Sequence, residues 1–218
     1  MTALSLSKQY TLREEIANSI THGLGILLSI AGLVILAVLA VRYGDAWHIV
    51  SCTIFGATLI LLYTASTLYH GISHPRVKNV LRIVDHSAIF LLIAGTYTPF
   101  TLVNLRGPWG WSLFGTVWGL TLLGIILELT PLRRFRLLSL ILYVGMGWAV
   151  VIAAKPLLES VAPQGLMLLA AGGLAYTGGI AFYVWRGLPH HHAIWHLFVL
   201  AGSALHFFAV LYYVIPIQ

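Results

Sequence analysis

Residues 19–41 read SITHGLGILLSIAGLVILAVLAV, an apolar run that contains no Asp, Glu, Lys or Arg. A helix rises about 1.5 Å per residue, so a run of this length crosses the roughly 30 Å hydrocarbon core of a bilayer. Comparable runs recur along the rest of the chain, separated by short polar gaps. The stretch therefore predicts a membrane span and sets the class of the whole protein.

The composition agrees with this class. The chain has 218 residues, of which 59% are hydrophobic and 8% are charged, whereas soluble domains carry about 25% charged residues. We predict an all-α polytopic membrane protein with seven transmembrane helices, a membrane domain over 19–218 and a cytoplasmic interfacial segment over 1–18. A capping box at Thr11 and Glu14 predicts a short helix in that segment. Gly, Pro and charged residues place the spans at 19–41, 46–70, 83–104, 108–129, 137–155, 165–185 and 193–216.

The basic residues predict the orientation of these spans. Three of the 12 Lys and Arg residues lie on one side of the predicted bundle, namely Arg42, Arg106 and Lys155. The others lie on the opposite side: Lys8, Arg13, Arg76, Lys78, Arg82, Arg133, Arg134, Arg136 and Arg186. The positive-inside rule then puts the amino terminus in the cytoplasm and the carboxy terminus outside. Because the basic residues are scattered over loops, topology explains the net charge of +6 better than binding to nucleic acid does.

Three histidines are candidate metal ligands. His192 and His196 are one turn apart at the start of span seven, which places both side chains on one helical face. Such an HxxxH pair is also typical of a polar helix start. His70 closes span two, and the orientation puts it on the side where span seven begins. Three neutral imidazoles with one open position form the arrangement of a catalytic zinc site. Cys52 is the single cysteine, so a thiolate cluster is excluded.

Asp85 and Ser66 are candidate catalytic residues beside these histidines. Asp85 opens span three on the same side, where it could accept a hydrogen bond from metal-bound water and take its proton. The alternatives are a carboxylate stabilised by the helix dipole and an ion pair with Arg82. Ser66 lies one turn before His70, so it could bond to Asp85 or to the water. A bond back to the carbonyl of its own helix is the alternative.

Other polar residues in the spans receive structural interpretations. His206 is ten residues beyond the HxxxH pair, hence about 15 Å deeper, and we expect it to bond to a neighbouring helix. His22 is interpreted as a buried polar tie, with a polar channel toward the metal site as the alternative. Glu128 lies near the inner end of span four, where we expect it to pair with Arg133 or Arg134.

An ordered set of motifs resembles the bacterial hemolysin III family over nearly the whole chain. The motifs are EEIANSITHG at 14–23, STLYH at 66–70, DHSAIF at 85–90, AGTYTPF at 94–100 and HAIWH at 192–196. That family is similar to the progestin and adiponectin receptors and, more distantly, to the alkaline ceramidases. The resemblance implies an integral protein of the bacterial plasma (inner) membrane. It also implies that His70, His192 and His196 bind zinc, with Asp85 on the metal-bound water and Ser66 in the same shell.

The leading functional hypothesis is a zinc-dependent hydrolase, with Asp85 as general base, that acts on an amide or ester bond of a membrane lipid. A site inside a helix bundle can admit acyl chains laterally from the bilayer. The alternatives are a non-enzymatic sensor with a structural zinc and a cytolytic protein. The polar residues gather near one end instead of lining several helices, which disfavours a pore. The residues leave open the substrate, the oligomeric state and the metal, because imidazole ligands also suit copper, iron and nickel.

Overall fold

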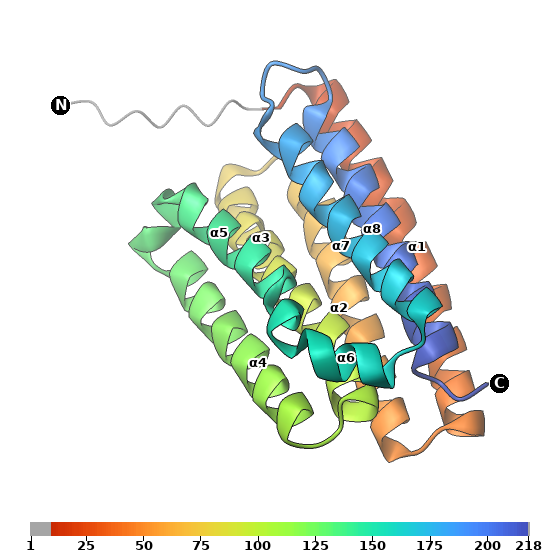
Figure 1. Ribbon diagram of the computed structural model, residues 1–218. Helices are drawn as coiled ribbons and strands as arrows, with labels where there is room; N and C mark the ends of the chain where they lie inside the picture. The colour runs from red at the N-terminus through yellow and green to blue at the C-terminus, as the bar shows by residue number, and fades with distance from the viewer. Residues whose placement is uncertain (1–9, 218) are drawn as a thin grey trace.

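The computed structural model describes residues 10–217, and no strand occurs among them. The long helices run alternately up and down, so that α1 and α8 begin at the same end of the bundle (Figure 1). The elements are α1 (Leu12–Tyr43), α2 (Ala46–Gly71), α3 (Pro75–Pro99), the π-helical turn η1 (Phe100–Asn104), α4 (Pro108–Leu129), the 3₁₀ turn η2 (Pro131–Arg134), α5 (Arg136–Gly147), the 3₁₀ turn η3 (Ala149–Ala153), α6 (Ala154–Ser160), α7 (Pro163–Val184) and α8 (His191–Tyr213).

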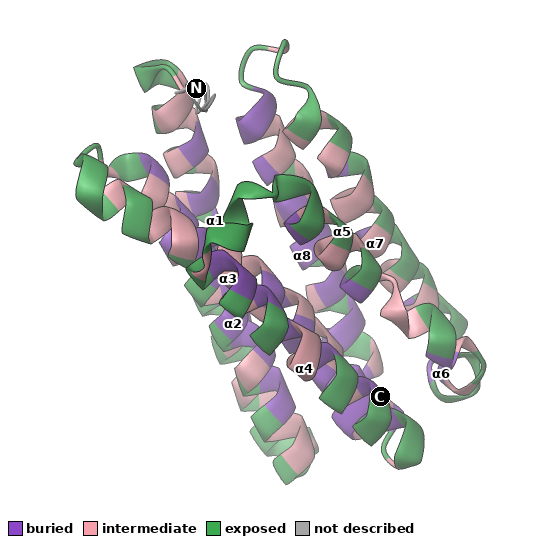
Figure 2. Ribbon diagram, turned by 90° about the vertical axis from the view of Figure 1, so that its left-hand side faces the viewer, coloured by how far each residue is buried: buried purple, intermediate pink, exposed green. Residues whose placement is uncertain are grey.

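The seven predicted spans are confirmed. Among the described residues, seven helical segments are long and apolar enough to cross a membrane, with α3 continued by η1 and α5 continued through η3 and α6. The outer faces of the helices are exposed, whereas buried residues line the interior of the bundle (Figure 2). Many of the exposed side chains are Leu, Ile and Val, whose exposure to water would be unfavourable. The fold is therefore that of an integral membrane protein.

Helix α1 has its polar and small side chains inside the bundle and most of its large apolar side chains outside, the reverse of a helix in a soluble protein. Its buried face consists mainly of polar and small residues at helical spacing, with Leu36 as the one large aliphatic member: Asn18, His22, Gly25, Ser29, Gly32, Leu36 and Ala40. Its exposed face carries the large aliphatic side chains. A Cβ on Gly25 would lie 2.6 Å from the Tyr63 ring of α2. Small residues therefore let the helices approach closely, as membrane helix packing requires.

The predicted capping box at the start of α1 is confirmed. The Thr11 side chain accepts from the Glu14 backbone N–H, and the Glu14 carboxylate accepts from the Thr11 backbone N–H. The helix then runs without interruption from Leu12 to Tyr43. The short interfacial helix that we expected within 1–18 is therefore the first turns of α1. Residues 1–9 of that segment lie outside the described part of the chain.

Besides α1, which begins seven residues before the predicted span at 19, two spans depart clearly from the predicted bounds. Helix α3 begins at Pro75, eight residues before the predicted start at 83, because proline suits the first turn of a helix. The basic residues at 76, 78 and 82 limit the apolar span but not the helix. Span five is not one continuous helix, since α5 gives way to η3 after Gly147. The Tyr97 hydroxyl accepts from the Val150 N–H at 2.9 Å and lies 2.9 and 3.0 Å from the carbonyls of Met146 and Gly147. One side chain thus satisfies the backbone at the break.

A polar contact also ties the centre of the bundle. The Tyr63 hydroxyl of α2 donates to Ser203 Oγ of α8 at 2.7 Å, and the Tyr176 hydroxyl of α7 lies 2.8 Å from the same Oγ. His206 Nε2 of α8 lies 3.1 Å from the Leu169 carbonyl of α7, which confirms the predicted bond to a neighbouring helix. These contacts hold α8 against α2 and α7.

Candidate metal centre

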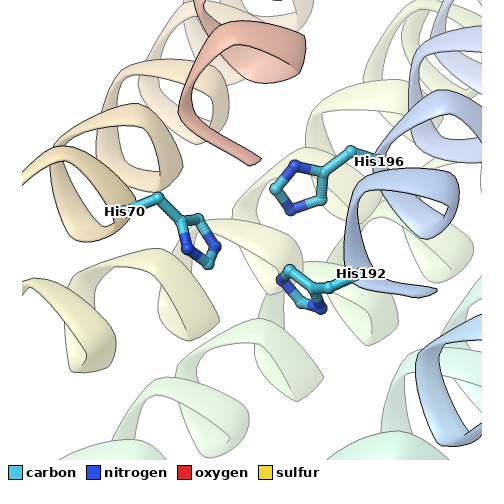
Figure 3. Close-up of side chains that lie close together, drawn as sticks. All are labelled: His70, His192 and His196. Atoms are coloured by element: carbon cyan, nitrogen blue, oxygen red, sulfur yellow. The ribbon is translucent and has the colours of Figure 1, made fainter. Parts of the chain in front are cut away.

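The three candidate ligands meet at the end of the bundle where α1 begins. His70 lies in the last turn of α2, and His192 and His196 lie in the first two turns of α8. Their exposed fractions are 3%, 9% and 1%. One ligand atom from each ring lies within 4.8 Å of the other two, and Figure 3 shows the rings turned toward a common space. The structure therefore brings together the three histidines that could hold a metal ion.

The orientation of His196 is set by α1. Its Nδ1 lies 3.1 Å from the Asn18 carbonyl oxygen and 3.1 Å from Thr21 Oγ1. A carbonyl oxygen only accepts hydrogen bonds, so Nδ1 carries the proton. The lone pair of the neutral ring is then on Nε2. Backbone acceptors fix the tautomer of many metal-binding histidines in this way.

His70 also packs against α1, next to Glu15 and Asn18. Its Nδ1 lies 2.6 Å from Glu15 Oε2 and 3.4 Å from Asn18 Nδ2. Glu15 also forms an ion pair with Lys78 of α3, with 2.9 Å between Oε1 and Nζ. The carboxylate accepts the proton of Nδ1, so the Asn18 amide is a neighbour of His70 and not its acceptor, whereas the Asn18 backbone carbonyl is the partner of His196.

The donor set fits a metal ion. His70 Nε2 and His192 Nδ1 are buried and have no hydrogen-bond partner among the described residues, whereas buried polar atoms in proteins are nearly always paired. A cation that accepted these lone pairs would satisfy both atoms. Ligand nitrogens about 2.0 to 2.1 Å from a tetrahedral zinc lie roughly 3.3 Å from one another. The candidate ligand atoms, all within 4.8 Å of one another, would close by at most about 1.5 Å to reach this spacing.

Asp85 and Ser66 lie beside the histidines but outside the group of three that could hold an ion. Their exposed fractions are 8% and 1%. The polar neighbours of the Asp85 carboxylate are, in order of decreasing electrostatic effect, His86, His70, Ser66 and Arg82. Both residues line a cavity of about 170 Å³ that also reaches His192 and His196. The structure therefore places the two predicted catalytic residues at a cavity that is lined by two of the three candidate metal ligands.

The cavity extends from the histidines into the bundle. Its walls come from α2, α3, α5, α7 and α8, and they include Tyr176 and His206 far from the metal ligands. His22 lines it as well, with its ring stacked on His196 at 3.5 Å between centroids and 11° between planes. Neither nitrogen of His22 has a hydrogen-bond partner among the described residues. His22 is thus buried, as expected, but it contacts a ligand histidine instead of tying two helices by a hydrogen bond.

The expected partner of Glu128 was wrong. Glu128 accepts a hydrogen bond from Ser139 Oγ at 2.7 Å, and its Oε2 lies 3.5 Å from His86 Nδ1. The sequence favoured Arg133 or Arg134 because they follow closely along the chain. Both arginines are exposed, whereas Glu128 is turned inward, so the pairing is between helices.

Sequence reasoning missed four residues that surround the histidines. Glu15, Asn18 and Thr21 belong to α1, which supplies no ligand. Their signal was a set of polar residues at helical spacing on one face of an apolar helix. Tyr10 is the fourth, with its ring 5.0 Å from His192 and 5.8 Å from His70 between centroids. Burial raises the pKa of the Tyr10 hydroxyl, so it stays protonated at neutral pH.

Comparisons with known proteins give the family. The model of the family described as "Haemolysin-III related" matches residues 10–207. The chain is 53% identical over 208 residues to a hemolysin-3 homolog of Bacillus subtilis, covering 95% of this chain and 98% of that protein. It is 52% identical over 205 residues to hemolysin-3 of Bacillus cereus, covering 94% of each chain.

A more distant relative extends the likeness beyond bacteria. The chain is 27% identical over 176 residues to a protein of Oryza sativa subsp. japonica named heptahelical transmembrane protein ADIPOR2, covering 71% of this chain and 77% of that protein. This likeness agrees with the wider receptor-related superfamily that the motifs indicated. On the match over residues 10–207 and the two Bacillus relatives, the chain belongs to the haemolysin III family.

Proposed function

We propose that this protein is a zinc-dependent hydrolase that cleaves an amide or ester bond of a membrane lipid. The observation that carries the proposal is the cavity shared by His192, His196, Asp85 and Ser66. When bound, zinc supplies a Lewis acid that polarises a carbonyl group and lowers the pKa of water to about 7. His70, His192 and His196 would hold the ion through neutral imidazoles.

The residues around the ligands have separate tasks in this proposal. Asp85 takes the proton of the attacking water and later returns it to the leaving group, as a general base and acid. Ser66, a polar neighbour of the Asp85 carboxylate, would orient it by donating a hydrogen bond. The apolar side chains of α5 and α7 exclude bulk water from the reacting bond. This division of tasks requires Asp85 to remain outside the ligand set.

The size and setting of the cavity support a lipid substrate. A cavity of about 150 Å³ holds one benzene molecule, so the cavity of about 170 Å³ takes only the reacting end of a lipid. The remaining acyl chain would extend into the bilayer. We further propose that residues 1–18 lie at the cytoplasmic interface of the bacterial inner membrane and that the carboxy terminus lies outside. The basic loops at the histidine end of the bundle support this orientation.

The test uses purified full-length protein and its His70→Ala variant. We expect the wild type to contain about one zinc per chain, and lipid mass spectrometry of the membranes to show a product that the variant does not form. The control variant is His48→Ala, because His48 pairs with Asp45 at the opposite end of α2. Wild-type protein without metal, or equal lipid profiles for wild type and His70→Ala, would refute the proposal.

A second candidate is a membrane sensor in which zinc joins α2 to α8. The contacts of both ligand helices with α1 favour it, because a metal there would lock three helices together. This candidate predicts that His70→Ala lowers the melting temperature of the zinc-loaded protein. It also predicts that no lipid product forms in wild type, which separates it from the hydrolase.

A further inference from the structure

We propose that Glu15 is a positioning residue of the metal centre: its carboxylate fixes the tautomer and orientation of His70, and Lys78 fixes the carboxylate. The inference rests on the proposed zinc site but not on the proposed hydrolysis. Glu15 lies on α1, which supplies none of the three candidate ligands. In this role, Glu15 would make α1 part of the metal centre through its contact with His70, on the ring nitrogen that does not face the metal.

The carboxylate of Glu15 bridges two cationic or proton-donating groups. Oε2 lies 2.6 Å from His70 Nδ1, and Oε1 lies 2.9 Å from Lys78 Nζ. The side chains are 16% exposed for Glu15, 0% for His70 and 27% for Lys78. Both oxygens are therefore engaged, so the carboxylate cannot rotate without losing one of the two contacts.

Lys78 is itself held in place by α2. Its ammonium donates to the Tyr69 carbonyl at 2.8 Å and approaches the Ile72 carbonyl at 3.5 Å. It also lies over the Tyr69 ring, 4.9 Å from the centroid. These carbonyls belong to the end of α2, where unpaired backbone oxygens favour a cation. The last turn of α2, which carries His70, is thus fixed by the same lysine that orients Glu15.

The contact with Glu15 determines which nitrogen of His70 can bind a metal. A carboxylate accepts hydrogen bonds, so Nδ1 carries the proton and the lone pair lies on Nε2. His70 Nε2 is the buried atom without a partner among the described residues. A carboxylate behind a ligating imidazole also raises its basicity. Because the partner of His196 is a neutral carbonyl, Glu15 supplies the anionic contact behind the ligand set.

A simpler role for Glu15 would be an ion pair with Lys78 that joins α1 to α3. The two roles predict different results. If Glu15 only joins helices, its replacement lowers the stability of the metal-free protein and leaves the affinity for zinc unchanged. If Glu15 positions His70, its replacement weakens zinc binding even where the metal-free protein keeps its stability.

The experiment measures zinc dissociation constants for the full-length protein in detergent, by competition with a chromophoric chelator. Loss of an outer partner of a metal ligand typically costs about 10- to 100-fold in affinity, and we expect this loss for Glu15→Gln. Glu15→Asp keeps the charge but is one methylene shorter, so it should bind zinc nearly as weakly as Glu15→Gln. Lys78→Met should cause a smaller loss, since the contact between Glu15 and His70 remains.

The matched control is Glu14→Gln. Glu14 is the neighbouring carboxylate of α1, and it contacts Thr11 and the His190 backbone instead of a candidate ligand. We expect this variant to bind zinc as the wild type does. Melting temperatures of the metal-free proteins measure the structural role of each residue separately.

The outcomes separate this inference from the proposed function. Equal affinities for wild type and Glu15→Gln would overturn the inference, as would full rescue by Glu15→Asp, which would show that only the charge matters. A wild-type protein that takes up no zinc would overturn both the inference and the metal site. Zinc binding that depends on Glu15 without any lipid turnover would uphold the inference and refute the hydrolase.

Discussion

Replacing Asp85 by Asn separates a general base from a metal ligand. Asn has the shape of Asp and can still contact the Ser66 hydroxyl, but it cannot take a proton at neutral pH. Asp85 lies outside the group of three histidines that could hold an ion. We therefore expect Asp85→Asn to retain its zinc and its fold while losing turnover.

The expected loss follows from the role assigned to the carboxylate. A positioned general base contributes about 10²- to 10⁴-fold to the rate, which corresponds to roughly 3 to 5 kcal/mol in the activation barrier. Turnover by Asp85→Asn should thus fall to about 1% of wild type or below. Stability should not fall in parallel, because the neutral amide is less costly to bury than the 8% exposed carboxylate.

The assay follows release of lipid product over time in reconstituted vesicles, with zinc content measured on the same samples. The matched control is Asp45→Asn, since Asp45 caps α2 at the other end of that helix and Asn caps equally well. Two results would refute the reasoning. Loss of zinc from Asp85→Asn would show that Asp85 is a metal ligand, and turnover equal to that of wild type would show that Asp85 is not the general base.

Two further predictions concern buried polar side chains inside the bundle. Ser203→Ala removes the hydroxyl that Tyr63 and Tyr176 share. At about 0.6 to 1.7 kcal/mol for each interhelical bond, the free energy of unfolding measured by SDS titration should fall by about 1 to 3 kcal/mol. An unchanged free energy would show that these two hydrogen bonds do not stabilise the bundle. His22→Phe keeps the stack on His196 but removes both ring nitrogens. We expect unchanged zinc content, because His22 lies outside the group of three, and reduced lipid turnover, because its unpaired nitrogens belong to a residue that lines the cavity. Unchanged turnover would limit His22 to packing.

The membrane fold and the three candidate ligand histidines could be predicted from apolar runs, helical spacing and the order of the spans. Helical spacing puts His192 and His196 on one face, and the alternating direction of the spans brings His70 and Asp85 to the same end. Neither step requires knowledge of side-chain packing. The break after Gly147 was not predicted, because the stretch over 137–155 is as apolar as a continuous span and its backbone is satisfied by Tyr97, a residue of another helix.

The partners of buried polar groups were harder to predict. Glu128 pairs with His86 and Ser139 of other helices, whereas the sequence suggested arginines nearby in the chain. Glu15 lies close to His70 although 55 residues separate them. Spacing within one helix shows which residues share a face, but the rotation of each helix against its neighbours depends on packing. The contacts that set the tautomers of the histidines therefore required the structure.

The depth of the site favours a lipid substrate over a soluble one. His70 and His192 lie in the terminal turns of α2 and α8, hence within about one helical pitch, or 5.4 Å, of the helix ends. The interfacial region on each side of a bilayer is roughly 5 to 8 Å thick, so helix ends in that region put the histidines near the hydrocarbon boundary. The ester and amide bonds of membrane lipids lie at this boundary, between headgroup and acyl chain. A catalytic metal there would meet the scissile bond without extracting the lipid from the bilayer. The position of the histidines along their helices therefore supports the proposed hydrolysis more directly than their number does.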